Sequence, residues 1–336
     1  MKARTSCSFQ FWLLLACTPS PAPSDSPPLP APQGQLTLVQ IDCEGWLGEA
    51  MLIIGPDGTT VLIDAGNDDH VEIIAAAVEA RTGDTHVDAL LLTHFHEDHA
   101  GGLGGLPLDI DLTVSRGPVH LDAVDLPDGF DRTPRVDLCT DTSCDLPWIL
   151  DLGEGATLTV FAADGQIDGQ RFGDLPGDDD GENARSLVGI VEWGSFTYLF
   201  NGDLTGGGKD TPDMESFYAA RMDAWVPASG ATIGHLGHHG IDSSTWDAWI
   251  ARVFPSGSSH VALVGSNGSY LDAPADEVLD RVRDHVQSVW VTRGGAFTGE
   301  DPLLRDAEDD VVIDVSEGGA AVNIHGGALP DEILAP

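Results

Sequence analysis

Four potential metal ligands fall within six consecutive residues, and this cluster constrains the chain more than any other feature. His94, His96, Asp98 and His99 follow directly after the apolar run ALLLT (89–93). Such a run is typical of a buried strand, and alternate side chains at its end point the same way. Neutral imidazoles with a carboxylate form a ligand set for Zn²⁺, or for Mn²⁺ or Fe when further oxygens join. A single histidine is usually structural, but this spacing predicts a site for one or two divalent metal ions.

The pattern around this cluster alternates between strands and helices. Strands are predicted at 36–41, 50–54, 60–64, 89–93, 158–162, 187–193, 197–200, 231–236, 260–264, 289–292, 311–315 and 320–324. Helices are predicted at 71–81, 214–222, 246–253 and 276–285. Hairpins near both ends, with strand–helix units between them, predict an α/β fold in which two sheets pack face to face with helices outside, an αββα sandwich. The Asp-, Gly- and Pro-rich stretch 117–182 is expected to be loop insertions around the strand at 158–162.

Residues 1–34 do not have the pattern of a folded domain. Lys2 and Arg4 precede the short apolar run FQFWLLLA (9–16), and Cys17 follows it. This order is the outline of a secretory signal, and LLAC resembles the bacterial lipobox, whose cysteine becomes the lipidated first residue. Pro and Ser dominate the next residues and predict an extended tether. An ordinary cleaved signal is the alternative.

We therefore expect a signal peptide at 1–17 with lipidation at Cys17, a tether at 18–34 and one hydrolase domain at 35–336. Such a protein would be an extracytoplasmic bacterial lipoprotein, anchored in the membrane through its lipid. Cys139 and Cys144 lie in a polar loop, and the sequence leaves open whether they form a disulfide or stay free thiols. Cys43 is expected to be buried as a small apolar residue.

The charge of the chain bears on its partners. Asp and Glu number 55 against 15 Lys and Arg, a formal net charge of -40, and the only lysines are Lys2 and Lys209. A surface of this charge repels polyanions, which disfavours nucleic acids and anionic membrane surfaces. No apolar run reaches the roughly 18 residues of a membrane-spanning helix. We expect a small phosphodiester or another ester as substrate.

The segment HFHEDH matches in full the HxHxDH signature of the metallo-β-lactamase superfamily, which the chain resembles from 36 to about 324. Further matching pieces follow in order: VLIDAG (61–66), FNGDL (200–204) and GHHG (237–240). The resemblance implies one or two metals at the sheet edges, with Asp203 bridging them and Asp64 supporting a ligand. The implied metal ligands are His94, His96, Asp98, His99, Asp203 and His239.

Within this assignment some roles stay open. His94 and His96 would hold one ion, and Asp98, His99 and a histidine of GHHG the other. We favour His239 as that ligand and His238 as the catalytic residue that faces the substrate, although the order could be reversed. Asp98 would also act in catalysis, since its carboxylate can accept a hydrogen bond from the attacking hydroxide.

A narrower resemblance links the chain to the hydrolase domain of ComEC/Rec2-type competence proteins and to secreted phosphodiesterases. It rests on IDCEGWLGEAMLI (41–53), on Asn183 and Ser186 in ENARSLV, and on HHG followed by two serines. In that group an asparagine, here Asn183, stands where other members carry a metal histidine. The fourth residue of HHGI and the DAP at 272–274 depart from the group, which leaves the substrate open.

These features predict a metal-dependent hydrolase, foremost a phosphodiesterase. The alternatives are a lactone, thioester or β-lactam hydrolase on the same fold and a non-enzymatic, metal-stabilised surface lipoprotein. We expect His235 to line the wall of the site and favour this over a role as metal ligand. We expect Asp178–Asp180 to be a solvated acidic loop and favour this over a cation site. The isolated histidines are expected to be structural or exposed: His70, His86, His120, His260, His285 and His325.

Overall fold

The computed structural model describes residues 34–336 apart from 46, 120–123, 257–258, 267–272, 294–300 and 317. The predicted signal peptide, Cys17, nearly all of the tether and His120 lie outside the described residues. Within the described part, no helix is long and apolar enough to cross a membrane.

The N-terminal part of the chain and the C-terminal hairpins build the first sheet. Its strand order is β21-β20-β19-β1-β2-β3-β5-β7-β8, and β3, β5, β7 and β8 run parallel. The strands are β1 (Leu36–Gln40), β2 (Met51–Ile54), β3 (Thr60–Ile63), β5 (Ala89–Leu92), β7 (Thr113–Ser115), β8 (Arg135–Asp137), β19 (Val311–Ser316), β20 (Ala321–His325) and β21 (Glu332–Leu334). The short strands β4 (His86–Val87) and β6 (Asp109–Ile110) pair separately.

The middle of the chain builds the second sheet. Its order is β12-β11-β10-β13-β14-β15-β16-β17-β18, with β9 paired to β10, and β14 to β18 run parallel. The strands are β9 (Trp148–Gly153), β10 (Ala156–Ala163), β11 (Gln166–Ile167), β12 (Gln170–Arg171), β13 (Val188–Trp193), β14 (Phe196–Phe200), β15 (Ile233–His235), β16 (Val261–Val264), β17 (Ser288–Val291) and β18 (Leu304–Asp306).

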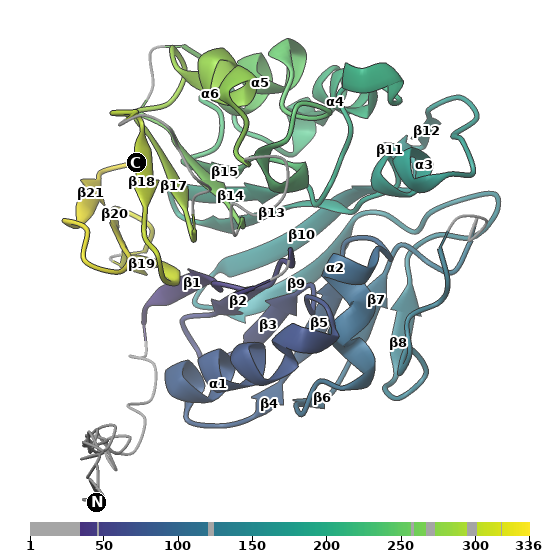
Figure 1. Cartoon of the computed structure of the whole chain (residues 1–336), viewed down its shortest axis with the longest axis horizontal. Helices are drawn as coiled ribbons and strands as arrows, with labels where there is room; N and C mark the ends of the chain where they lie inside the picture. Colours follow the sequence, from purple (N-terminus) through teal and green to yellow (C-terminus); the bar gives the residue numbers. More distant parts are fainter. Residues whose placement is uncertain are drawn as a thin grey trace, which may run out of the picture.

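Helices cover the outer face of each sheet (Figure 1). The α-helices are α1 (Val71–Thr82), α2 (Glu97–Ala100), α3 (Asp179–Asn183), α4 (Met214–Ala219), α5 (Asp247–Val253) and α6 (Asp276–Val282). The short 3₁₀ segments are η1 (Asp68–His70), η2 (Gly101–Gly104), η3 (Gly208–Asp210), η4 (Met222–Ala224) and η5 (His238–Gly240). Helices α1 and α2 lie with the first sheet, and α4, α5 and α6 with the second.

The alternation of side chains along each strand produces three apolar layers. In β1, Leu38 points between the sheets and packs in one cluster with Val191 of the second sheet. The next residue, Val39, points outward into a cluster with Ile74 of α1. On the far side, α4 and α5 pack against the second sheet in a third cluster. The predicted αββα sandwich is therefore confirmed.

The prediction for residues 117–182 was wrong in part. This stretch holds β8, α3 and the antiparallel pair β9–β10. The pairing of these two strands extends from Gly153 opposite Ala156 to Trp148 opposite Val160. The sequence of β9, WILDLG, is mostly apolar, and the structure leaves Ile149 and Asp151 exposed. The structure also joins Cys139 and Cys144 in a disulfide and buries Cys43.

Candidate metal centre

The predicted ligands meet at the carboxyl ends of parallel strands from both sheets. Asp64 follows β3, and residues 94–99 follow β5 in the first sheet. Asp203 follows β14, and His238 and His239 follow β15 in the second sheet. Because the carboxyl ends of parallel neighbours lie at one sheet edge, segments far apart in sequence converge there.

His94, His96 and Asp203 form one group of potential ligands. His94 Nε2 lies 3.1 Å from His96 Nδ1 and 3.8 Å from Asp203 Oδ2. His94 and Asp203 are buried, whereas His96 is half-buried and lines an open cleft. One ligand atom from each residue lies within 4.8 Å of the others. This spacing suits a single divalent ion.

Glu49, His99, Asp203 and His239 form a second, fully buried group within the same 4.8 Å limit. His99 Nε2 lies 3.1 Å from Asp203 Oδ1, and His239 Nε2 lies 3.8 Å from Asp203 Oδ2. Asp98 reaches this group from the cleft, with Oδ2 3.2 Å from His239 Nε2. Asp203 belongs to both groups, so its carboxylate stands where it can bridge two ions.

The residues present fit divalent metal ions. Among the described residues, His96 Nε2, His99 Nε2 and Asp203 Oδ1 are buried without a hydrogen-bond partner. His99 Nε2 and Asp203 Oδ1 face each other at 3.1 Å. Buried polar atoms without a partner are rare and require an explanation. Imidazole nitrogens and carboxylate oxygens around a shared point are the donors that Zn²⁺, Mn²⁺ and Fe²⁺ bind.

Asp64 holds His99 from behind. Its Oδ2 lies 2.8 Å from His99 Nδ1, while the backbone N–H and the hydroxyl of Thr93 donate to its two oxygens at 2.7 Å each. A carboxylate at one ring nitrogen orients the imidazole and leaves the other nitrogen to face a metal. The structure thus places Asp64 where a supporting residue is needed.

The charges of the site are strongly coupled. Burial opposes protonation of His99, but Asp203, Asp98 and Asp64 hold its pKa well above the usual value. Burial also opposes ionisation of Asp203, but the neighbouring histidines, His99 foremost, hold its pKa well below the usual value. The carboxylate of Asp203 is therefore ionised, which is the form that binds metal cations.

His238 and His239 diverge although they are adjacent. Both have a φ of 54°, in the left-handed region that non-glycine residues rarely adopt. His239 is buried, and its Nδ1 lies 3.0 Å from Gly265 O, so its Nε2 faces Asp98. His238 lines the cleft, with Nδ1 2.7 Å from Ser243 Oγ. Burial lowers the pKa of His238 to about 4 despite the attraction of Asp203.

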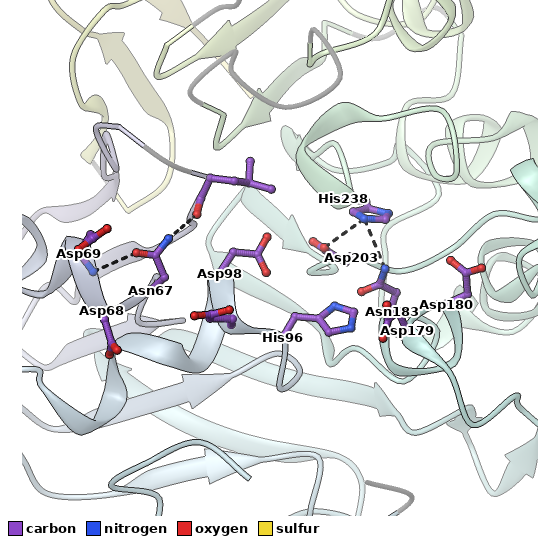
Figure 2. Close-up of a pocket in the computed structure, with 12 residues that line it drawn as sticks. Asn67, Asp68, Asp69, His96, Asp98, Asp179, Asp180, Asn183, Asp203 and His238 are labelled. Carbon is purple, nitrogen blue, oxygen red and sulfur yellow. Dashed lines mark hydrogen bonds and ion pairs between the residues drawn. The ribbon is translucent and has the colours of Figure 1, made fainter. Parts of the chain in front are cut away.

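Asn183 closes the site from the second sheet. It ends α3 and is buried, and its Nδ2 lies 3.4 Å from His238 Nε2. Its Oδ1 has no hydrogen-bond partner among the described residues, and the side chain lines the cleft. The cleft is a cavity of about 950 Å³ in which His96, Asp98, Asp203 and His238 converge (Figure 2).

Glu49 is a residue of the site that the sequence analysis did not single out. Its Oε1 lies 2.6 Å from His235 Nε2 and its Oε2 3.5 Å from His239 Nδ1. His235 is a buried wall residue that holds Glu49, with its own Nδ1 3.1 Å from Asn201 Oδ1. The available signal was a lone carboxylate immediately before the apolar run AMLII (50–54).

Glu182 is a second such residue. It accepts hydrogen bonds from Phe95 N at 2.9 Å and from Arg116 Nε at 3.0 Å, and both charged side chains are buried. It therefore ties the segment after β5 to α3. Nothing in the sequence clearly indicated this role, because no local pattern pairs Phe95 with Glu182, 87 positions later.

The remaining predicted residues fall into two classes. Asp179 and Asp180 of the acidic loop line the cleft. His70, His260, His285, His325 and His86 lie elsewhere and bond the backbone or a nearby carboxylate. His86 gathers with Asp88 and Asp111 in a partly exposed group.

Comparisons with known proteins agree with this fold. The sequence model of the metallo-beta-lactamase superfamily matches residues 45–256. A curated relative described as beta-lactamase-like protein 2 homolog from Caenorhabditis elegans is 28% identical over 120 residues, 35% of this chain and 37% of its own length. The match therefore spans little more than a third of that relative.

Solved structures with a similar fold share little sequence with the chain. Metallo-beta-lactamase SMB-1 is 17% identical, with a TM-score of 0.37 over 62% of this chain and 81% of its own. Zn²⁺-bound PqqB from Methylobacterium extorquens is 16% identical, with a TM-score of 0.34 over 59% and 71%. Because the family's sequence model covers more than half of the chain, the protein belongs to the metallo-beta-lactamase superfamily.

Proposed function

We propose that this superfamily hydrolase is a two-metal phosphodiesterase that acts on small substrates. The observation that carries the proposal is the sharing of Asp203 between two ligand groups, His94 with His96 and Glu49 with His99 and His239. Two ions bound side by side would activate water and stabilise the charge that develops on the phosphoryl oxygens, a pairing suited to phosphoryl transfer.

The chain's own residues then orient the reactants. Asp64 keeps His99 in one orientation through its 2.8 Å contact with Nδ1. Asp98 lies at the cleft, where its carboxylate can accept a hydrogen bond from the attacking hydroxide. His238 stands across the cleft with its Nδ1 2.7 Å from Ser243 Oγ, and its proposed role is to donate a hydrogen bond to a substrate oxygen. The roles of Asp98 and His238 remain those inferred from sequence.

The charge of the cleft supports a small substrate. Its described lining includes Asp68, Asp69 and Asp179 but neither lysine nor arginine. A long polyanion gains affinity mainly from cationic contacts to its phosphates. This cleft offers it none beyond the metals, so we expect single-stranded DNA to be a poorer substrate than a small diester.

The test is a substrate panel with metal-loaded protein. Bis-p-nitrophenyl phosphate, single-stranded DNA, a lactone and nitrocefin are compared at equal concentrations of the scissile bond. Hydrolysis of the diester above the others supports the proposal. Faster hydrolysis of nitrocefin or the lactone would identify the alternative acyl hydrolase, and no turnover at all would favour a metal-stabilised, non-enzymatic protein.

We further propose export and lipid anchoring at Cys17. The support is the sequence alone: a basic start, a short apolar run, the LLAC segment and the Pro/Ser-rich tether. In this arrangement the folded domain stands outside the cytoplasm at the end of an extended linker.

A further inference from the structure

Carboxylates stand on two sides of the cleft that contains the candidate metal centre. Asp68 and Asp69 of η1 line one side, which we call the η1 rim. Asp179, Asp180 and Asn183 of α3 line the other, which we call the α3 rim. Figure 2 shows the two rims on opposite sides of His96 and Asp98.

No cationic side chain balances these charges within the described lining of the cleft. The nearby Arg116 is buried and paired with Glu182, and Arg185 is buried and paired with Asp164. The gaps in the described range, residues 46, 120–123, 257–258, 267–272, 294–300 and 317, contain neither lysine nor arginine in sequence. A cationic group entering the cleft therefore meets carboxylates that lack a basic partner there.

The α3 rim carries a second, independent feature. Asn183 is 3% exposed, lines the cleft and has an Oδ1 without a partner among the described residues. Asp180 lies three residues earlier on the same short helix, so the two side chains occupy neighbouring positions. A buried amide oxygen without a donor is a place for a ligand N–H group.

We propose that the α3 rim binds a protonated amine of the substrate, which makes the preferred substrate a zwitterionic, aminoalkyl phosphodiester. The inference rests on the proposed phosphodiesterase function. The metal centre would take the phosphate, while Asp179 and Asp180 attract the ammonium group and Asn183 Oδ1 accepts a hydrogen bond from one of its N–H groups. Because Asn183 Nδ2 is 3.4 Å from His238 Nε2, the amine site adjoins the reacting centre.

The amine is a better fit than two other occupants. A third metal ion would need converging ligand atoms, and no group of potential ligands in the described part of the chain includes Asp179 or Asp180. A quaternary ammonium group would be attracted by the carboxylates but has no N–H to donate to Asn183 Oδ1. The inference therefore specifies a protonated amine that carries at least one N–H group.

The experiment compares 2-aminoethyl p-nitrophenyl phosphate with propyl p-nitrophenyl phosphate, which share a leaving group and differ in the cation. We expect kcat/KM of the wild type to be about tenfold higher for the aminoethyl ester, the value of one charge-assisted hydrogen bond. The ratio should fall towards one in the double variant Asp179→Asn/Asp180→Asn.

The matched control is Asp276→Asn/Glu277→Gln, which removes two exposed carboxylates from the first turn of α6, outside the described cleft lining. It removes the same number of negative charges and should keep the tenfold ratio. A wild-type ratio near one, or the same loss in both double variants, would overturn the inference and leave the phosphodiesterase proposal standing.

Failure of the proposed function has a different signature. If neither ester is hydrolysed, calorimetry of ethanolamine phosphate and propyl phosphate with the metal-loaded protein decides the inference by binding alone. Tighter binding of ethanolamine phosphate, lost in the α3 double variant, supports the amine site. Equal binding of both phosphates refutes it.

Discussion

Glu49 lies beneath the candidate metal ligands, where its charge acts on both buried histidines of the second group. Burial opposes its ionisation, but His235, followed by His239 and His99, lowers its pKa below the usual value. It is therefore a carboxylate at neutral pH, held at Oε1 by His235 and with Oε2 free to face His239 or a metal.

We expect Glu49→Gln to weaken metal binding at this group about 10- to 100-fold, the usual effect of removing a supporting carboxylate. Metal affinity measured by competition with a chromogenic chelator checks this. Glu72→Gln, which alters an exposed carboxylate on α1, should bind metal like the wild type. Unchanged affinity in Glu49→Gln would show that this carboxylate plays no part in holding metal.

Some residues of the site could be predicted from the sequence and others could not. His94, His96, Asp98 and His99 are readable because their spacing is local and the preceding strand is apolar. Glu49 was not predicted because its partners, His235 and His239, come from the second sheet. No local pattern shows which carboxylate will lie under the site.

At the scale of single elements, α5 begins without a capping side chain of its own. Glu215 of α4 supplies the acceptors instead, since Thr245 N and Trp246 N donate to its two carboxylate oxygens at 2.6 and 2.8 Å. Burial raises the pKa of Glu215 to about 8, more than these two hydrogen bonds lower it.

The raised pKa of Glu215 makes the stability of the fold depend on pH. Between pH 4.5 and 8 the unfolded chain loses the proton of Glu215 while the folded chain keeps it, so the contribution of this group to stability falls as pH rises. Glu215→Gln removes the contribution. Urea midpoints at pH 5 and pH 8 should therefore differ less in the variant than in the wild type; equal differences would contradict the assignment.

A buried ion pair between Arg116 and Glu182 fastens α3 to the segment that follows β7. Arg116 also lies over the Phe95 ring, with Cζ 4.7 Å from its centroid. Removing one partner of such a buried pair leaves the other charge without compensation.

We predict that Glu182→Gln lowers the free energy of unfolding by about 3–5 kcal/mol. Asp131→Asn breaks an exposed pair with Arg135 and should cost about 0–1 kcal/mol. Chemical denaturation of both variants measures the contrast. A loss for Glu182→Gln no larger than that for Asp131→Asn would mean that the buried pair does not fasten α3.

The elements themselves were largely predictable where turn residues bound them, as in the hairpin of β2 and β3 around Pro56–Gly58 and in α1, which ends before Gly83. Short strands escaped, among them β7, β18 and β21, because three residues carry too little periodicity. The strand β9 was missed although its sequence, WILDLG, is mostly apolar, because the Asp-, Gly- and Pro-rich residues around it were interpreted as loop.

At the level of the whole protein, the proposed lipid anchor would hold a strongly acidic domain at the membrane. With a net charge of -40 the protein should not adhere to anionic lipid by charge. We therefore predict that Cys17→Ser moves the protein from the membrane fraction to the soluble fraction in a bacterial host. Immunoblots of both fractions test this, and a variant that stays with the membrane would refute the lipobox.

The count of bound metal ions per chain tests the central claim most directly. Mass spectrometry of dialysed protein should find two divalent ions in the wild type and in His325→Ala, whose histidine pairs with Asp314 away from the site. Asp203→Ala should retain fewer than one ion and lose hydrolysis of bis-p-nitrophenyl phosphate, because both ligand groups share this carboxylate. An Asp203→Ala protein that binds as much metal as the wild type would contradict a shared two-metal centre.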